Sequence, residues 1–180
     1  MVTTPPFPAP TPAELAVVSA QLGRPARGVV GIAARCRCGN PTVVATTPRL
    51  PDGTPFPTFY YLTHPAATAA MSTLEATHVM PELAALLDDD AEVAEAYRAA
   101  HDAYLADRAQ FGEVPEIDGI SAGGMPTRVK CLHALAGHAL AAGPGANPIG
   151  DAALERSSWS PEVCRCEDPG AAVREAARSA

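Results

Sequence analysis

The stretch from residue 28 to residue 47 constrains the fold of this chain most. Residues 28–35 (GVVGIAAR) and 42–47 (TVVATT) are rich in β-branched side chains and alternate as strands do. Between them lies CRCGNP (36–41), a composition typical of a turn. We therefore predict a β-hairpin that carries two cysteines at its tip.

The rest of the chain is divided by proline and glycine into one more strand and a series of helices. The third strand is expected at 58–62 (TFYYL). Helices are expected at residues 12–22, 66–77, 81–87, 91–110 and 126–142, with a short helical turn at 151–156. These elements predict an α+β fold, with a small three-stranded antiparallel sheet packed with four or five helices.

The length of 180 residues fits a single domain. Residues 1–10 are expected to be a disordered proline-rich tail, because proline and threonine dominate them. Residues 11–156 are expected to form the α+β domain. Residues 157–180 are expected to be a poorly ordered C-terminal tail.

The charge pattern excludes some classes of protein. The net charge is −7, and residues 61–120 hold twelve acidic residues against two arginines. A nucleic-acid-binding protein needs a basic stripe, which this chain lacks, so we expect no nucleic-acid partner. The chain also lacks the run of about 20 apolar residues that would cross a membrane.

The cysteines are the strongest chemical signal. A chain without an export signal is expected in the reducing cytoplasm, where clustered cysteines bind metals or catalyse reactions more often than they form disulfides. Cys36 and Cys38 lie two residues apart in a turn, so both thiolates can face one ion. Zinc takes four such ligands, and an iron–sulfur cluster is the less favoured occupant. The alternative is two small buried residues, since free cysteine is among the most buried residue types.

Further residues qualify as metal ligands. His64 follows the third strand and precedes a helix that begins with proline, where it is either a ligand or a helix cap. Cys131 lies near the start of the last long helix. His138 shares its face but lies about 10.5 Å farther along the axis, too far to bind the same ion, and His133 is expected on the opposite side of the helix. Cys164 and Cys166 repeat the Cys-x-Cys spacing and would complete a four-cysteine site, although they lie in the expected tail.

Basic residues indicate a second kind of site, for an anion. A phosphate or carboxylate would be held near the start of the last long helix, where backbone donors also lie. A loop with four prolines presents an arginine and an aspartate that can pair across its turn. The candidate residues are Arg49, Asp52, Arg128, Lys130 and His133, with His138 as an acid–base group. The alternatives are ordinary solvated charges and a rigid structural loop.

Three long motifs resemble one bacterial family, the domain of unknown function 501. They are CRCGNPTVV, PRLPDGTPFPTFYYLTHP and GGMPTRVKCLHALAGHALAAGPGANPIGD. In the family pattern the position of His64 holds either Cys or His, an exchange that metal ligands tolerate. The resemblance thus implies a metal site formed by Cys36, Cys38, His64 and Cys131. It does not clearly include Cys164 and Cys166.

We therefore expect a structural zinc site, since four protein ligands leave no open coordination position. One alternative is an enzyme or sensor that binds a small anionic or phosphorylated ligand through the basic residues. Another is a non-catalytic protein that binds a partner through its acidic helix 91–110, linked through the family's neighbouring genes to cell division or the envelope. The chain has no nucleotide-binding fingerprint, phosphate-binding loop, nucleophile elbow or HExxH helix, and enzymatic activity stays open.

Overall fold

The computed structural model describes residues 5–178 and has the expected α+β fold. The strands β1 (Val29–Arg35), β2 (Pro41–Thr46) and β3 (Tyr60–Leu62) pair antiparallel in the order β1-β2-β3. The helices of the described residues are α1 (Pro12–Leu22), α2 (Pro65–Ala76), α3 (Val79–Asp89), α4 (Ala91–Ala109), α5 (Leu132–Ala142), α6 (Pro148–Arg156) and α7 (Ala171–Arg178), with a 3₁₀ helix at Pro115–Ile117. The predicted three-stranded antiparallel sheet is confirmed. Two helices, α6 and α7, form where the sequence indicated a turn and a tail.

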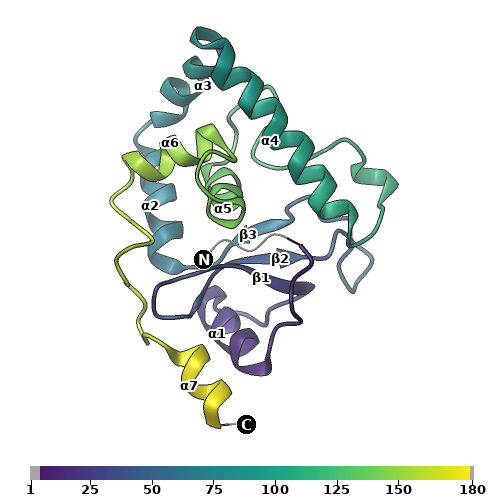
Figure 1. Cartoon of the computed structure of the whole chain (residues 1–180), viewed down its shortest axis with the longest axis vertical. Coiled ribbons are helices and arrows are strands. Elements are labelled where there is room, and N and C mark those ends of the chain that lie inside the picture. Colours follow the sequence, from purple (N-terminus) through teal and green to yellow (C-terminus); the bar gives the residue numbers. More distant parts are fainter. Residues whose placement is uncertain (1–4, 179–180) are drawn as a thin grey trace.

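Helices cover both faces of the sheet (Figure 1). All six residues of β2 are buried. Successive residues of a strand face opposite sides of the sheet, and here helices cover both sides. Val43 and Ala45 belong to the main core, which includes most of α5. Val44 packs in a smaller cluster with Val18 of α1 and Ile32 of β1. The hairpin is therefore held between α5 and α1.

Glycines allow α5 to pack closely against β3 and α6. A Cβ atom at Gly137 of α5 would lie 3.1 Å from the backbone oxygen of Tyr60. At Gly150 of α6, a Cβ atom would lie only 2.3 Å from the backbone oxygen of Leu135. The two glycines thus set how deeply α5 is buried between the sheet and α6.

The last long helix, α5, begins later than the sequence indicates. The backbone N–H groups of Arg128 and Lys130 donate to the carbonyls of Gly124 and Gly123, at 2.9 and 2.7 Å. Both glycines have positive φ angles, 97° and 72°, which other residues rarely adopt. The N–H groups of Arg128 and Lys130 are therefore bonded within this loop and not within a helix. The helix α5 starts only after its N-cap, Cys131.

The two chain ends pack against the domain. We call residues 157–178 the C-terminal segment. It leaves α6 and returns to the hairpin, where α7 packs beside α1 (Figure 1). At the other end, Phe7 packs against Phe59 and Phe111. Across residues 5–178, no helix has the length and apolar character needed to cross a membrane.

Candidate metal centre

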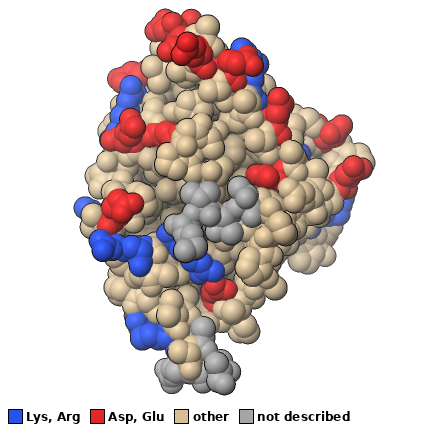
Figure 2. Space-filling model, viewed as in Figure 1, with Lys and Arg blue, Asp and Glu red and all other residues tan. Residues whose placement is uncertain are grey.

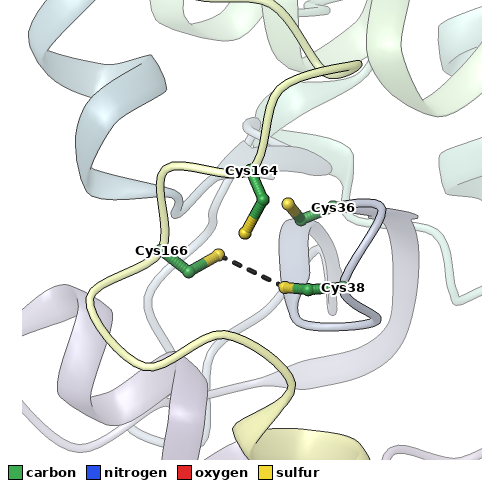
Figure 3. A group of neighbouring side chains, drawn as sticks. All are labelled: Cys36, Cys38, Cys164 and Cys166. Carbon is green, nitrogen blue, oxygen red and sulfur yellow. Dashed lines mark hydrogen bonds between the residues drawn. The ribbon is translucent and has the colours of Figure 1, made fainter.

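Four cysteines from two distant parts of the chain meet at one point (Figure 3). Cys36 and Cys38 belong to the turn between β1 and β2, and Cys164 and Cys166 belong to the C-terminal segment. Their Sγ atoms all lie within 4.8 Å of one another. The Sγ atoms of Cys38 and Cys166 are 3.6 Å apart, although the residues are separated by 128 positions.

The turn between β1 and β2 is shaped by its own backbone hydrogen bonds. The N–H of Cys36 donates to the carbonyl of Asn40 at 2.9 Å, and the N–H of Gly39 donates to the carbonyl of Cys36 at 2.8 Å. Gly39 has a φ angle of 90°, a conformation that favours glycine. This tight turn brings both of its cysteines toward the C-terminal segment (Figure 3).

Polar contacts bind the C-terminal segment to the same turn. The guanidinium of Arg37 donates to the carbonyl of Glu162 at 2.9 Å. The side chain of Asn40 donates to the carbonyl of Asp168 at 2.8 Å and accepts the N–H of Ala172 at 3.1 Å. Asn40 is buried, so these bonds are shielded from water. The segment is thus positioned by contacts on both sides of its two cysteines.

Burial and neighbouring groups shift the pKa values of Cys36, Cys38 and Cys166. Burial raises the pKa of Cys36, and burial together with the neighbouring Cys38 sulfur raises the pKa of Cys166. Burial also raises the pKa of Cys38, but backbone N–H donors, with those of Asn40 and Gly170 foremost, lower it to about 7. One thiolate therefore forms readily, and a cation that takes the place of the remaining protons would stabilise all four sulfurs.

The spacing of the sulfur atoms fits one tetrahedral ion. With zinc–sulfur bonds of about 2.3 Å, the sulfur atoms of a Cys₄ site lie roughly 3.8 Å apart. The Sγ atoms of Cys38 and Cys166, 3.6 Å apart, lie close to this spacing, and all four sulfur atoms lie within 4.8 Å of one another. A cluster of several irons and sulfides needs a wider cage. The cysteines are free, and 3.6 Å is far longer than a disulfide bond of about 2.05 Å.

His64 lies beside the cluster and caps α2. Its Nδ1 accepts the N–H of Ala67 at 3.5 Å, so its Nε2 carries the hydrogen. Nε2 lies 3.3 Å from the Sγ of Cys166 and donates toward that sulfur. His64 is fully buried, which lowers its pKa and keeps it neutral. The four converging ligand atoms do not include His64, which is placed to orient one of them.

Cys131, expected from the family resemblance as the fourth ligand, belongs to a different cluster. Its Sγ lies 4.0 Å from the Nδ1 of His133, which in turn lies 3.2 Å from Oε1 of Glu75. The His133 ring lowers the pKa of the Cys131 thiol. Cys131 therefore does not join Cys36 and Cys38 at one metal site. It is the N-cap of α5 and faces α2, whereas the hairpin tip faces the C-terminal segment.

The proline-rich loop uses its charged residues within the protein. Arg49 forms an ion pair with Glu116 at 2.6 Å and donates to the carbonyl of Gly53 at 2.8 Å. Asp52 accepts the N–H of Thr54 at 3.0 Å, so it caps the turn and does not pair with Arg49. Both residues therefore stabilise the loop.

The other residues expected to bind an anion contact different partners. Arg128 and Lys130 are exposed in the loop before α5. His133 faces Glu75 of α2, and His138 is fully buried in the core. The structure does not gather these side chains around one pocket for an anion.

His138 is enclosed by aromatic rings. Its ring stacks on Tyr60, with centroids 5.4 Å apart and an interplanar angle of 8°. Its Nδ1 accepts from the side-chain amide of Asn147 at 3.2 Å, and its Nε2 has no partner in the described structure. Burial lowers its pKa to about 4. A side chain this enclosed does not reach a ligand from solvent.

Because His138 is buried in its neutral form, we expect the free energy of unfolding to decrease as the pH falls from 6.5 to 4. The unfolded chain gains a proton on His138 below a pKa of 6.5, whereas the folded chain gains it only near 4. Folding is therefore weakened by about 3 kcal/mol as the pH falls through this window. Urea unfolding at several pH values should show this slope in the natural protein and a smaller slope in His138→Phe. Both proteins share the same cysteines, so equal slopes would contradict the assignment to His138.

Three acidic residues of α4 lie on the exposed surface of that helix. Glu92, Glu95 and Asp102 of α4 are exposed, and Glu95 pairs with Arg98 of the same helix at 2.5 Å. In the space-filling view, acidic side chains gather at the end of the molecule where α3 meets α4 (Figure 2). This face is solvated in the isolated chain.

Sequence reasoning gave too little weight to three residues. Cys164 and Cys166 were set aside because they lie in an expected tail, although their spacing repeats that of the hairpin cysteines. That repeated spacing was the available signal. Glu75 was not singled out, because an acidic residue near a helix end carries no distinctive pattern.

Comparisons with known proteins identify a family but no function. A family model described as protein of unknown function (DUF501) matches residues 32–155. Cys36 and Cys38 lie inside this range, and Cys164 and Cys166 lie beyond it. No curated protein and no solved structure matches the chain.

Proposed function

The chain belongs to the DUF501 family, for which no function is described, and we propose that its four cysteines form a structural zinc site that fastens the C-terminal segment to the hairpin. The supporting observation is the convergence of four Sγ atoms within 4.8 Å of one another. Four thiolates complete the tetrahedron of zinc and leave no position for a substrate. The role of the site is therefore structural and not catalytic.

The choice of zinc follows from the ligands and their spacing. Soft thiolates select zinc, copper(I) or iron–sulfur clusters among biological metals. Sulfur atoms this close suit a single ion, which favours zinc over a cluster. Thiols of this kind stay reduced and metal-bound in a reducing compartment, which supports a cytoplasmic location.

His64 and Arg37 support the site from outside. His64 donates toward the Sγ of Cys166, as residues around structural metal ions commonly do to their ligands. Arg37, between the two hairpin cysteines, donates to the carbonyl of Glu162 and holds the C-terminal segment against the turn. Both contacts would remain when the ion is bound.

Metal analysis of the full chain tests this proposal. After purification without oxygen and dialysis against a weak chelator, the natural protein should retain one zinc ion per chain. The double variant Cys38→Ser/Cys166→Ser should retain none. Cys131→Ser, which leaves the four-cysteine cluster intact, is the matched control and should retain one zinc ion. Cobalt in place of zinc should give the intense charge-transfer absorption of four thiolate ligands.

Two outcomes would contradict the proposal. One is a fully folded, reduced natural protein that binds no metal when zinc is supplied. The other is iron with an equal amount of sulfide in the protein purified without oxygen, which would assign the cysteines to an iron–sulfur cluster.

A further inference from the structure

A second group of potential ligands lies where the end of α2 meets the start of α5. It consists of Glu75 near the end of α2, the N-cap Cys131 and His133 in the first turn of α5. Their ligand atoms all lie within 4.8 Å of one another. These residues are separate from the four-cysteine cluster and have no part in its proposed function.

The hydrogen bonds of the His133 ring determine which nitrogen carries the hydrogen. Nε2 lies 3.2 Å from the carbonyl oxygen of Thr68 and 3.1 Å from the hydroxyl of Ser72. A carbonyl oxygen only accepts, so Nε2 must donate to it. In a neutral ring, Nδ1 then presents a lone pair toward Glu75 and Cys131.

Three electron-pair donors thus converge on one point. The Nδ1 of His133 lies 3.2 Å from Oε1 of Glu75 and 4.0 Å from the Sγ of Cys131. A carboxylate oxygen and a ring lone pair repel unless a positive centre lies between them. That centre is either a proton on Nδ1 or a metal ion.

The distances fit a metal ion as well as a proton. A charge-assisted N–H···O bond between imidazolium and carboxylate has a length of about 2.7–2.9 Å. The observed 3.2 Å lies at the long end of the range for N–H···O bonds in general. With zinc bonds of about 2.0–2.3 Å, the nitrogen–oxygen and sulfur–nitrogen edges of a tetrahedron measure roughly 3.3 and 3.6 Å. The observed 3.2 and 4.0 Å lie close to these edges.

The surroundings hold these ligands in place. The Oε1 of Glu75 also accepts the N–H of Leu132 at 2.7 Å, which fixes the carboxylate at the start of α5. The Thr68 carbonyl fixes the His133 ring, the arrangement found behind most metal-binding histidines. The side chains of His133 and Glu75 remain 27% and 29% exposed, so an ion and a water molecule can enter from solvent.

We propose that Glu75, Cys131 and His133 form a second zinc-binding site, with one coordination position open to solvent. Three protein ligands and a water molecule are the arrangement of catalytic zinc sites, whereas a fourth protein ligand closes a structural site. The thiolate and imidazole ligands favour zinc over magnesium or calcium, which prefer oxygen. The expected ligand of the open position is water or a small anion that replaces it.

Zinc titration of the full chain tests this site. The natural protein should bind two zinc ions, one retained against a weak chelator and one removed by it. His133→Asn should lower the affinity for the second ion by more than about 100-fold, since replacing a residue that only supports a ligand already lowers metal affinity 10–100-fold. His78→Asn replaces an exposed histidine at the start of α3 and should leave both ions bound.

Further variants separate this proposal from a folding effect and from the four-cysteine site. Glu75→Gln keeps an oxygen that accepts the Leu132 N–H, so it should retain the melting temperature of the metal-free protein and still lose the weaker ion. In Cys38→Ser/Cys166→Ser, X-ray absorption of bound zinc should show one sulfur ligand among nitrogen and oxygen ligands. A single bound zinc ion in the natural protein, lost only with Cys38 and Cys166, would overturn the second site and leave the first intact.

Discussion

Replacing Cys38 and Cys166 by serine should make the C-terminal segment open far more often and leave the rest of the domain folded. The ion would bind only the state in which the segment lies on the hairpin. At a zinc concentration 1,000 times its Kd, binding stabilises that state by about 4 kcal/mol. Removing the ligands should therefore speed amide hydrogen exchange in residues 160–174 by about 1,000-fold. Mass spectrometry of exchanged peptides measures this change.

The remaining contacts of the segment explain why the effect should be local. Without the ion, the segment is held by the bonds of Arg37 and Asn40 and by packing of α7 on α1. The main core of α5 and the sheet contains none of the four cysteines. Exchange in α5 should thus stay unchanged in the double variant.

Trypsin and the single tryptophan give independent measurements of the same release. Arg165 and Arg174 lie in the segment and should be cleaved much faster in the double variant. Trp159 is buried near His64, with ring centroids 5.5 Å apart, and its fluorescence reports whether opening reaches the start of the segment. Cys131→Ser serves as the control. Unchanged exchange and cleavage in the double variant would mean that the cluster does not fasten the segment.

Gly150→Ala should destabilise the whole domain by about 3 kcal/mol or more. An added Cβ atom would lie 2.3 Å from the backbone oxygen and 2.8 Å from the backbone carbon of Leu135. Backbone atoms in the middle of α5 cannot move aside as a side chain can, so α5 and α6 must separate. Overpacking of a tight core costs typically 1–3 kcal/mol and sometimes more.

Helix propensity alone would predict the opposite change in stability for Gly150→Ala. Alanine is favoured over glycine inside a helix by about 1 kcal/mol, so an uncrowded position would gain stability. Glu155→Ala, at an exposed position of the same helix, is the matched control and should change stability by less than about 0.5 kcal/mol. Urea unfolding of both variants measures the difference. A Gly150→Ala protein as stable as the natural one would show that α5 and α6 are less tightly packed.

Much of the fold followed from local patterns. The β-branched runs around the turn at 36–41 predicted the hairpin, and the strand at 60–62 lies within its expected range. The boundary of α5 was wrong because Gly123 and Gly124 form a loop where proline suggested the first helical turn. Such loops depend on positive φ angles that composition alone does not reveal.

The candidate metal residues show where local reasoning ends. Helix geometry separated both His133 and His138 from Cys131. The structure places His138 in the core, but it brings the Nδ1 of His133 to 4.0 Å from the Cys131 sulfur. The prediction for His133 was wrong because Cys131 is the N-cap of α5 and has extended backbone, so helical spacing does not apply to it. The grouping of Cys131 with the hairpin cysteines came from family resemblance, and the structure assigns it other neighbours. Glu75 becomes its neighbour only because α2 packs against α5.

The sequence by itself determined that two cysteines lie at the tip of a hairpin, because turn chemistry and strand alternation act between neighbouring residues. Only the tertiary structure decided which other ligands meet them. Cys38 and Cys166 are 128 positions apart, and their sulfur atoms approach to 3.6 Å because Asn40 and Arg37 bind the returning segment. Contacts over such separations depend on the packing of the whole chain, which no local pattern encodes.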